Sequence, residues 1–87
     1  MDWDSCPRAA SGIEINVVDD GYVVYDPELD KVHYLNHTAV LIFELCTGET
    51  KASELPGLLQ AAYELPEPPV QEVERYLEKL FQERLLR

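Results

Sequence analysis

Basic residues are scarce in this sequence. Seven Lys and Arg stand against 17 Asp and Glu, and the formal net charge at pH 7 is −10. A surface of this charge repels a phosphate backbone, which argues against nucleic-acid binding. Most of the imbalance lies in residues 1–50, where the only basic residues are Arg8 and Lys31. Such a distribution favours either simple solubility or attraction of a basic partner segment.

Long apolar runs and cysteine clusters are also missing. No apolar run approaches the roughly 18 residues of a membrane span, and the acidic N-terminus has no apolar stretch typical of a signal peptide. We therefore expect no membrane association and a cytoplasmic location. Cys6 and Cys46 belong to no CxxC or Cys/His cluster, so neither a disulfide framework nor a zinc site is expected. Cys46 lies in an apolar run and is interpreted as a buried small residue.

Motifs for catalysis are absent as well. The four glycines are isolated, so no phosphate-binding loop is present, and no Ser or Cys lies in a nucleophile elbow. His33 and His37 are four residues apart but straddle a predicted strand–helix junction, where helical ligand spacing does not apply. We expect no enzyme activity, no cofactor and no metal.

The chain contains one helix that is apolar on nearly every side. Asn36 is a suitable N-cap because its side-chain oxygen can accept an amide hydrogen of the first turn, and Gly48 can end the helix in a left-handed conformation. Between them, two apolar faces are formed by Ala39, Ile42, Phe43 and Cys46 and by Val40, Leu41 and Leu45. Such a helix belongs in the middle of a domain.

Three strands are predicted before this helix. Ile13, Ile15 and Val17 alternate with polar residues, residues 22–25 are β-branched and aromatic, and residues 31–35 form a third strand. Short turns at residues 19–21 and 26–30 imply an antiparallel meander whose last strand leaves one edge free. Residues 1–11 lack periodicity and are predicted to be a mobile tail, although the sequence leaves open whether Trp3 packs.

Two more helices are predicted after the central one. The second is capped by Thr50 or Ser53, and Pro56 favours Ser53 because proline is tolerated in a first turn. Its predicted inner stripe is Leu55, Leu58, Leu59 and Ala62. The third begins near Pro69, and its stripe comprises Val70, Val73, Leu77, Leu80, Phe81 and Arg84. The expected fold is α+β and winged-helix-like, with a three-stranded antiparallel sheet followed by three helices in one domain over residues 12–87.

Residues 24–39, VYDPELDKVHYLNHTA, followed by LCTG at 45–48, resemble the PqqD family. The most specific element is Leu35-Asn36-x-Thr38-Ala39 with Gly48, and the resemblance covers roughly residues 13–86. Arg84 departs from the family pattern, in which a Gly usually precedes the final leucines.

The resemblance implies a peptide chaperone, or RiPP recognition element. Such proteins bind the leader of a ribosomally synthesised precursor peptide and present it to a modifying enzyme, either a radical SAM enzyme or a lasso-peptide protease and cyclase. It implies that the leader adds a strand beside the third strand, facing the third helix. By position, the peptide-binding residues are Lys31, Val32, His33, Tyr34, Leu35, Val73, Tyr76, Leu77 and Leu80.

Elementary physics is consistent with that site, since strand addition requires a free sheet edge beside an apolar groove. Two interpretations stay open for Val32, Leu77 and Leu80, which are either groove or core. Tyr34 and Tyr76 are amphipathic and suit a groove lip. The alternatives are a winged-helix DNA-binding regulator that reads DNA with its third helix, and an adaptor domain for an unrelated protein.

Overall fold

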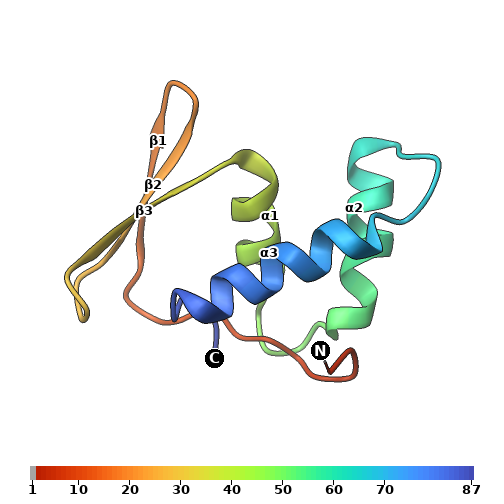
Figure 1. The fold of residues 1–87 in the computed structure, drawn as a ribbon, viewed down its shortest axis with the longest axis horizontal. Helices are drawn as coiled ribbons and strands as arrows, with labels where there is room; N and C mark the ends of the chain where they lie inside the picture. The colour runs from red at the N-terminus through yellow and green to blue at the C-terminus, as the bar shows by residue number, and fades with distance from the viewer. Residues whose placement is uncertain (1) are drawn as a thin grey trace.

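A computed structural model describes residues 2–87 and shows a sheet beside a group of helices (Figure 1). The sheet contains β1 (Glu14–Val18), β2 (Gly21–Asp26) and β3 (Lys31–Leu35). The helices are α1 (His37–Leu45), the 3₁₀ turn η1 (Ala52–Glu54), α2 (Leu55–Tyr63) and α3 (Val70–Gln82). The predicted α+β class, with three antiparallel strands followed by three helices, is confirmed.

The sheet is a meander in the order β1-β2-β3, and β3 has the bounds expected from the sequence. Asp19 and Asp20 connect β1 to β2, with Val18 paired to Gly21. The connection to β3 is stabilised by Asp26, which is buried. Its Oδ1 accepts hydrogen bonds from the N–H groups of Glu28 at 3.0 Å and Leu29 at 3.3 Å. Because this carboxylate satisfies the turn amides, it can occupy an otherwise apolar position.

Helix α1 begins as predicted and ends earlier than predicted. The Asn36 Oδ1 atom accepts the Ala39 N–H at 2.8 Å, which confirms the N-cap. The helix ends at Leu45 with Cys46 as its C-cap, so Gly48 does not end it. Gly48 has φ +87°, and an added Cβ would lie 2.7 Å from Arg8 Nε. Glycine suits this position because of the left-handed φ in the loop after the helix, and it also leaves room for the Arg8 side chain.

Helices α2 and α3 end in the same way, with a left-handed residue that is not glycine. Glu64 has φ +53° and Arg84 has φ +61°. In α3 the Leu85 N–H donates to Leu80 O and the Arg84 N–H donates to Phe81 O, which is a Schellman motif. Arg84, the departure from the family pattern, therefore adopts the backbone conformation that a glycine would adopt without strain.

Neither Thr50 nor Ser53 is the N-cap of α2, so this prediction was wrong: the helix follows Glu54, which makes no side-chain capping bond. A 3₁₀ turn at Ala52–Glu54 leads into the helix, and Pro56 lies in its first turn. Leu55 and Leu59 are buried as predicted, but Leu58 is 42% exposed and Ala62 is exposed. The inner stripe of α2 is narrower than predicted because the helix packs against α3 along a single face.

The core lies where α1 meets the inner face of the sheet and α3. Val24 and Leu35 enter it from the strands, and Ile42 and Phe43 enter it from α1. The remaining buried side chains from the helices and the C-terminus are Ala39, Val40, Cys46, Ala52, Leu55, Leu59, Val73, Leu77, Leu80, Leu85 and Leu86. Since two leucines of this core follow α3, the last residues of the chain are part of the folded body.

The N-terminal segment does not lie free of the domain. Residues 2–11 pass below the helices, beside the C-terminus (Figure 1). Backbone hydrogen bonds join Ala9 N–H to Cys46 O and Ala10 N–H to Leu85 O, both at 2.8 Å. Trp3 is half-buried against the core, and Pro7 and Ala10 are buried. The structure thus differs from the predicted mobile tail at residues 1–11, and we propose a folding unit that begins before residue 12. Residue 1 lies outside the described residues.

Deletion of residues 2–11 should lower the melting temperature. The truncation removes backbone partners of the loop after α1 and of the C-terminal strand-like segment. A loss of about 1 kcal/mol corresponds to roughly 4–8 °C in a domain of this size. Thermal unfolding followed by circular dichroism measures the change. An unaltered melting temperature would restore the interpretation of residues 1–11 as a mobile tail.

Phe43→Ala should destabilise the protein by about 3–5 kcal/mol through lost burial and a new cavity. Phe43 is 5% exposed, and it lies in α1 at the centre of the core. Leu58→Ala is the matched control, because that side chain is 42% exposed and should cost under about 1 kcal/mol. Denaturant titration gives both values. Equal costs for the two variants would show that α1 does not carry the core.

Candidate functional site

Strand β3 is the edge strand of the sheet next to the helices, and one side of its backbone is unpaired. Within residues 2–87, β3 pairs only with β2. The two-residue connection makes Val18 and Gly21 a hydrogen-bonded pair, and such pairs alternate along antiparallel strands. His33 is accordingly bonded to Val24, and Val32 and Tyr34 direct their N–H and C=O groups away from β2. These backbone groups form an open edge.

The side chains of β3 alternate between an inner face toward the helices and an outer face that is exposed to solvent. Leu35 and His33 lie on the inner face toward the helices, and Leu35 is 6% exposed. Val32 and Tyr34 lie on the outer face, where they are 55% and 76% exposed. The expectation that Val32 is either groove or core is resolved against the core. Tyr34 lies at the rim, as an amphipathic residue can.

A hollow of about 240 Å³ separates the end of β3 from α3. Its lining residues come from β3, α1 and α3 and are Tyr34, Leu35, Asn36, Ala39, Tyr76, Lys79 and Leu80. Asn36 connects the two sides, because its Nδ2 donates to the Tyr76 hydroxyl at 2.9 Å. Its Oδ1 simultaneously caps α1. The two bonds fix the Tyr76 ring at the rim of the hollow.

The structure brings together four of the predicted peptide-binding residues at this hollow: Tyr34, Leu35, Tyr76 and Leu80. Val73 and Leu77 are 0% exposed and belong to the core beneath it. Lys31, Val32 and His33 lie along β3 outside the lining. The lining also contains Asn36, Ala39 and Lys79, which the sequence interpretation omitted. Lys79 could have been found from its helical spacing, three residues after Tyr76.

His33 joins β3 to the end of α3. Its Nδ1 contacts the Glu83 carboxylate. The side chain of His33 is only 10% exposed, and that of Glu83 is 32% exposed. His33 Nε2 is buried and has no hydrogen-bond partner within the described chain. His33 therefore holds the edge strand against α3 from the inner face, and it does not present its ring to the hollow.

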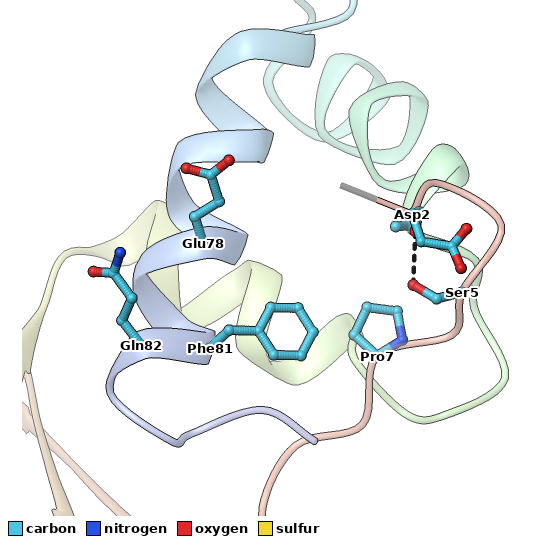
Figure 2. A pocket seen from close by; sticks show the side chains of 7 residues that line it. Asp2, Ser5, Pro7, Glu78, Phe81 and Gln82 are labelled. Carbon is cyan, nitrogen blue, oxygen red and sulfur yellow. Dashed lines mark hydrogen bonds between the residues drawn. The ribbon is translucent and has the colours of Figure 1, made fainter.

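Further hollows adjoin α3, and two of them show how far the helix is exposed. One, of about 380 Å³, continues past Tyr76 toward Tyr63 and Pro69. The other, of about 450 Å³, opens where α3 faces the N-terminal segment, and Figure 2 shows Phe81 pointing toward Pro7 there. The Ser5 hydroxyl donates to the Asp2 carbonyl at 2.7 Å in its wall. This last hollow does not include β3, so it is separate from the open edge.

The described residues offer little for covalent chemistry. Burial raises the pKa of the Cys46 thiol to about 12, so the group stays protonated and is not a nucleophile. Among residues 2–87, no three His, Cys, Asp or Glu side chains are grouped as a metal site requires. None of the helices in that range is long and apolar enough to cross a bilayer. What the site offers is an unpaired backbone edge beside an apolar hollow.

A comparison with protein families finds one whose description is "Coenzyme PQQ synthesis protein D (PqqD)", matching residues 21–86. The match includes β2, β3 and all of the helices, and so contains the whole candidate site. No curated protein matches the chain, and no solved structure does. The family takes part in the biosynthesis of PQQ and of other ribosomally made peptides, as an accessory domain that works with peptide substrates and modifying enzymes. On a match over most of its length, the chain belongs to the PqqD family.

Proposed function

We propose that this protein binds the leader of a ribosomally synthesised precursor peptide as a fourth strand on β3 and presents it to a peptide-modifying enzyme. The observation that carries the proposal is the open edge of β3 beside the hollow in front of α3. Strand addition uses such an edge, since backbone hydrogen bonds give affinity and side-chain pockets give selectivity. Membership of the PqqD family supports the same role.

The register of the sheet determines how the leader would bind. Its backbone would bond to the N–H and C=O groups of Val32 and Tyr34, because those of His33 and Leu35 are directed to β2. Leader side chains would then alternate between the two faces of the extended sheet. Those on the inner face would enter the hollow between Leu35 and Tyr76. An apolar side chain at this position fits the lining.

The role is that of a carrier and not of a catalyst. In this proposal the chemistry belongs to the partner, a radical SAM enzyme or a lasso-peptide protease and cyclase. This chain supplies a binding surface and requires no cofactor of its own. Its net charge of −10 would speed association with leaders that contain Lys or Arg.

The DNA-binding alternative receives no support from α3. The exposed side of that helix mixes Glu72 and Glu78 with Arg75 and Lys79, whereas a DNA-reading helix normally presents a basic face. A mobility-shift assay at low and moderate salt would separate the two functions, since phosphate contacts weaken steeply with salt.

Backbone methylation of the leader should test strand addition directly. The probe is a synthetic peptide spanning the leader of the cognate precursor, with single amide N-methyl groups placed along it. Methylation of an amide that faces β3 removes a donor to Val32 or Tyr34 and should abolish binding. Methylation of the alternate, outward amides should be tolerated. Calorimetric titration gives each affinity, and tight binding by every methylated peptide would contradict the strand-addition mode.

Tyr76→Ala should weaken leader binding by about 1–3 kcal/mol, as removal of an anchoring aromatic does. Tyr76 lines the hollow and is only half-buried, so the fold should survive. Tyr76→Phe keeps the ring but loses the bond from Asn36, and should retain most of the affinity. Tyr63→Ala, at the end of α2, is the control for an aromatic outside the site. A larger loss for Tyr63→Ala than for Tyr76→Ala would move the site to α2.

A further inference from the structure

The outer face of the sheet is apolar where an isolated domain would be expected to present polar side chains. Antiparallel sheets with one solvated face normally alternate, with apolar side chains inward and polar ones outward. In β3 the alternation is reversed in part: Leu35 points inward, but so does His33, and Val32 and Tyr34 point outward. The buried Asp26 of β2 is explained by its bonds to the turn amides. Val32 and Tyr34, in contrast, are 55% and 76% exposed and gain little burial in the domain.

The apolar residues of that face are contiguous. Val23 pairs with Tyr34 and Tyr25 pairs with Val32 across the strands, and Val18 lies on the same face of β1. We refer to Val18, Val23, Tyr25, Val32 and Tyr34 as the outer patch. The hydrogen bond from its hydroxyl to Asp30 Oδ1 raises the pKa of Tyr25 above its ordinary value, so this side chain stays neutral. Contiguous exposed apolar surface is typical of an interaction site.

The surroundings of the outer patch are acidic. Glu14 lies on the same face, Asp19 and Asp20 form the turn at one end, and Glu28 and Asp30 form the turn at the other. Lys31 is the single basic residue in residues 12–36. A partner that fits this face should therefore present apolar side chains surrounded by Lys or Arg. A second copy of this chain fits poorly, since it would bring the same acidic rim against itself.

The outer patch is continuous with the proposed leader site. A fourth strand on β3 would lay every second leader side chain beside Val32 and Tyr34 on the outer face. The protein with a leader bound, which we call the loaded protein, would then have a wider outer surface, made partly of leader side chains. The free protein would present only the part contributed by its own strands.

We propose that the outer patch is the docking surface for the modifying enzyme, and that the enzyme recognises this face together with the outward side chains of the bound leader. This inference rests on the proposed function. The partner surface is apolar with a basic rim, and docking is stronger to the loaded protein than to the free one. Presentation and substrate recognition then occur on the same surface, because the leader is part of what the enzyme contacts.

The test uses the full chain, the leader peptide of its cognate precursor, and the enzyme that modifies that precursor. Val23→Lys and Val18→Lys place a positive charge in the outer patch, on β2 and β1, and leave the backbone edge of β3 unchanged. Val17→Lys is the matched control. Val17 is adjacent in sequence to Val18 and 78% exposed, but it points to the opposite face of the same hairpin. Calorimetry gives the leader affinity of each variant, and surface plasmon resonance gives enzyme binding with and without saturating leader.

We expect the enzyme to bind the loaded wild type at least about tenfold more tightly than the free wild type, and Val23→Lys and Val18→Lys to lose about tenfold or more of the loaded affinity. The leader affinity of these variants, and both the leader and the enzyme affinity of Val17→Lys, should stay within about twofold, because none of the three changes alters the unpaired backbone groups of β3. The docking inference is overturned if Val17→Lys and Val18→Lys have equal effects, if enzyme binding does not depend on leader, or if sedimentation shows that the patch is covered by a second copy. If the leader does not bind the wild type, the proposed function is overturned. The docking inference then falls as well, because it requires a loaded protein.

Discussion

Helix α1 has apolar side chains on nearly every side and therefore requires cover from several elements at once. The inner face of the sheet supplies one cover and α3 supplies another, with Val24, Leu35 and Leu77 among the contacting core residues. Because β3 runs directly into α1 through Asn36, the end of this strand must lie close to the helix that it precedes. Because the sheet and α3 both pack against α1, the edge of β3 and the face of α3 lie opposite each other.

Asn36 makes that arrangement specific. A single side chain caps α1 through its oxygen and bonds Tyr76 on α3 through its nitrogen. Most N-cap residues satisfy only the first turn of their own helix. Here the cap also fixes the distance between α3 and the end of β3, and so shapes the hollow. A change at this position would affect helix stability and the site together, which makes Tyr76 the better residue for separating the two.

The sequence was informative where periodicity and capping act locally. The bounds of β3, the cap at Asn36 and the buried Cys46 were predictable because each depends on neighbouring residues. The role of Gly48 was not, since the helix ends at Leu45 and the left-handed φ of Gly48 belongs to the loop beyond it. The packing of residues 2–11 was not predictable either. They are held by backbone hydrogen bonds to residues distant in sequence, and such bonds leave no periodic pattern. Of the predicted site, Tyr76 and Leu80 line the hollow, whereas Val73 and Leu77 lie beneath it. Helical spacing predicted which residues of α3 share a face, but not how deeply each of them is buried.

The side chains of β3 depart from a simple alternation of buried apolar and exposed polar residues. Leu35 points inward and is 6% exposed, but Val32 points outward and is 55% exposed, and the inward His33 contacts Glu83. The observed orientation buries an imidazole and leaves a tyrosine 76% exposed. Local departures from the stabilising pattern tend to mark functional sites. The departure here lies on the strand whose edge is open, so the same five residues serve backbone pairing on one side and an exposed apolar face on another. In the proposed binding mode, backbone pairing would tolerate many leader sequences, which would leave discrimination to the few side chains that reach the hollow or the outer face.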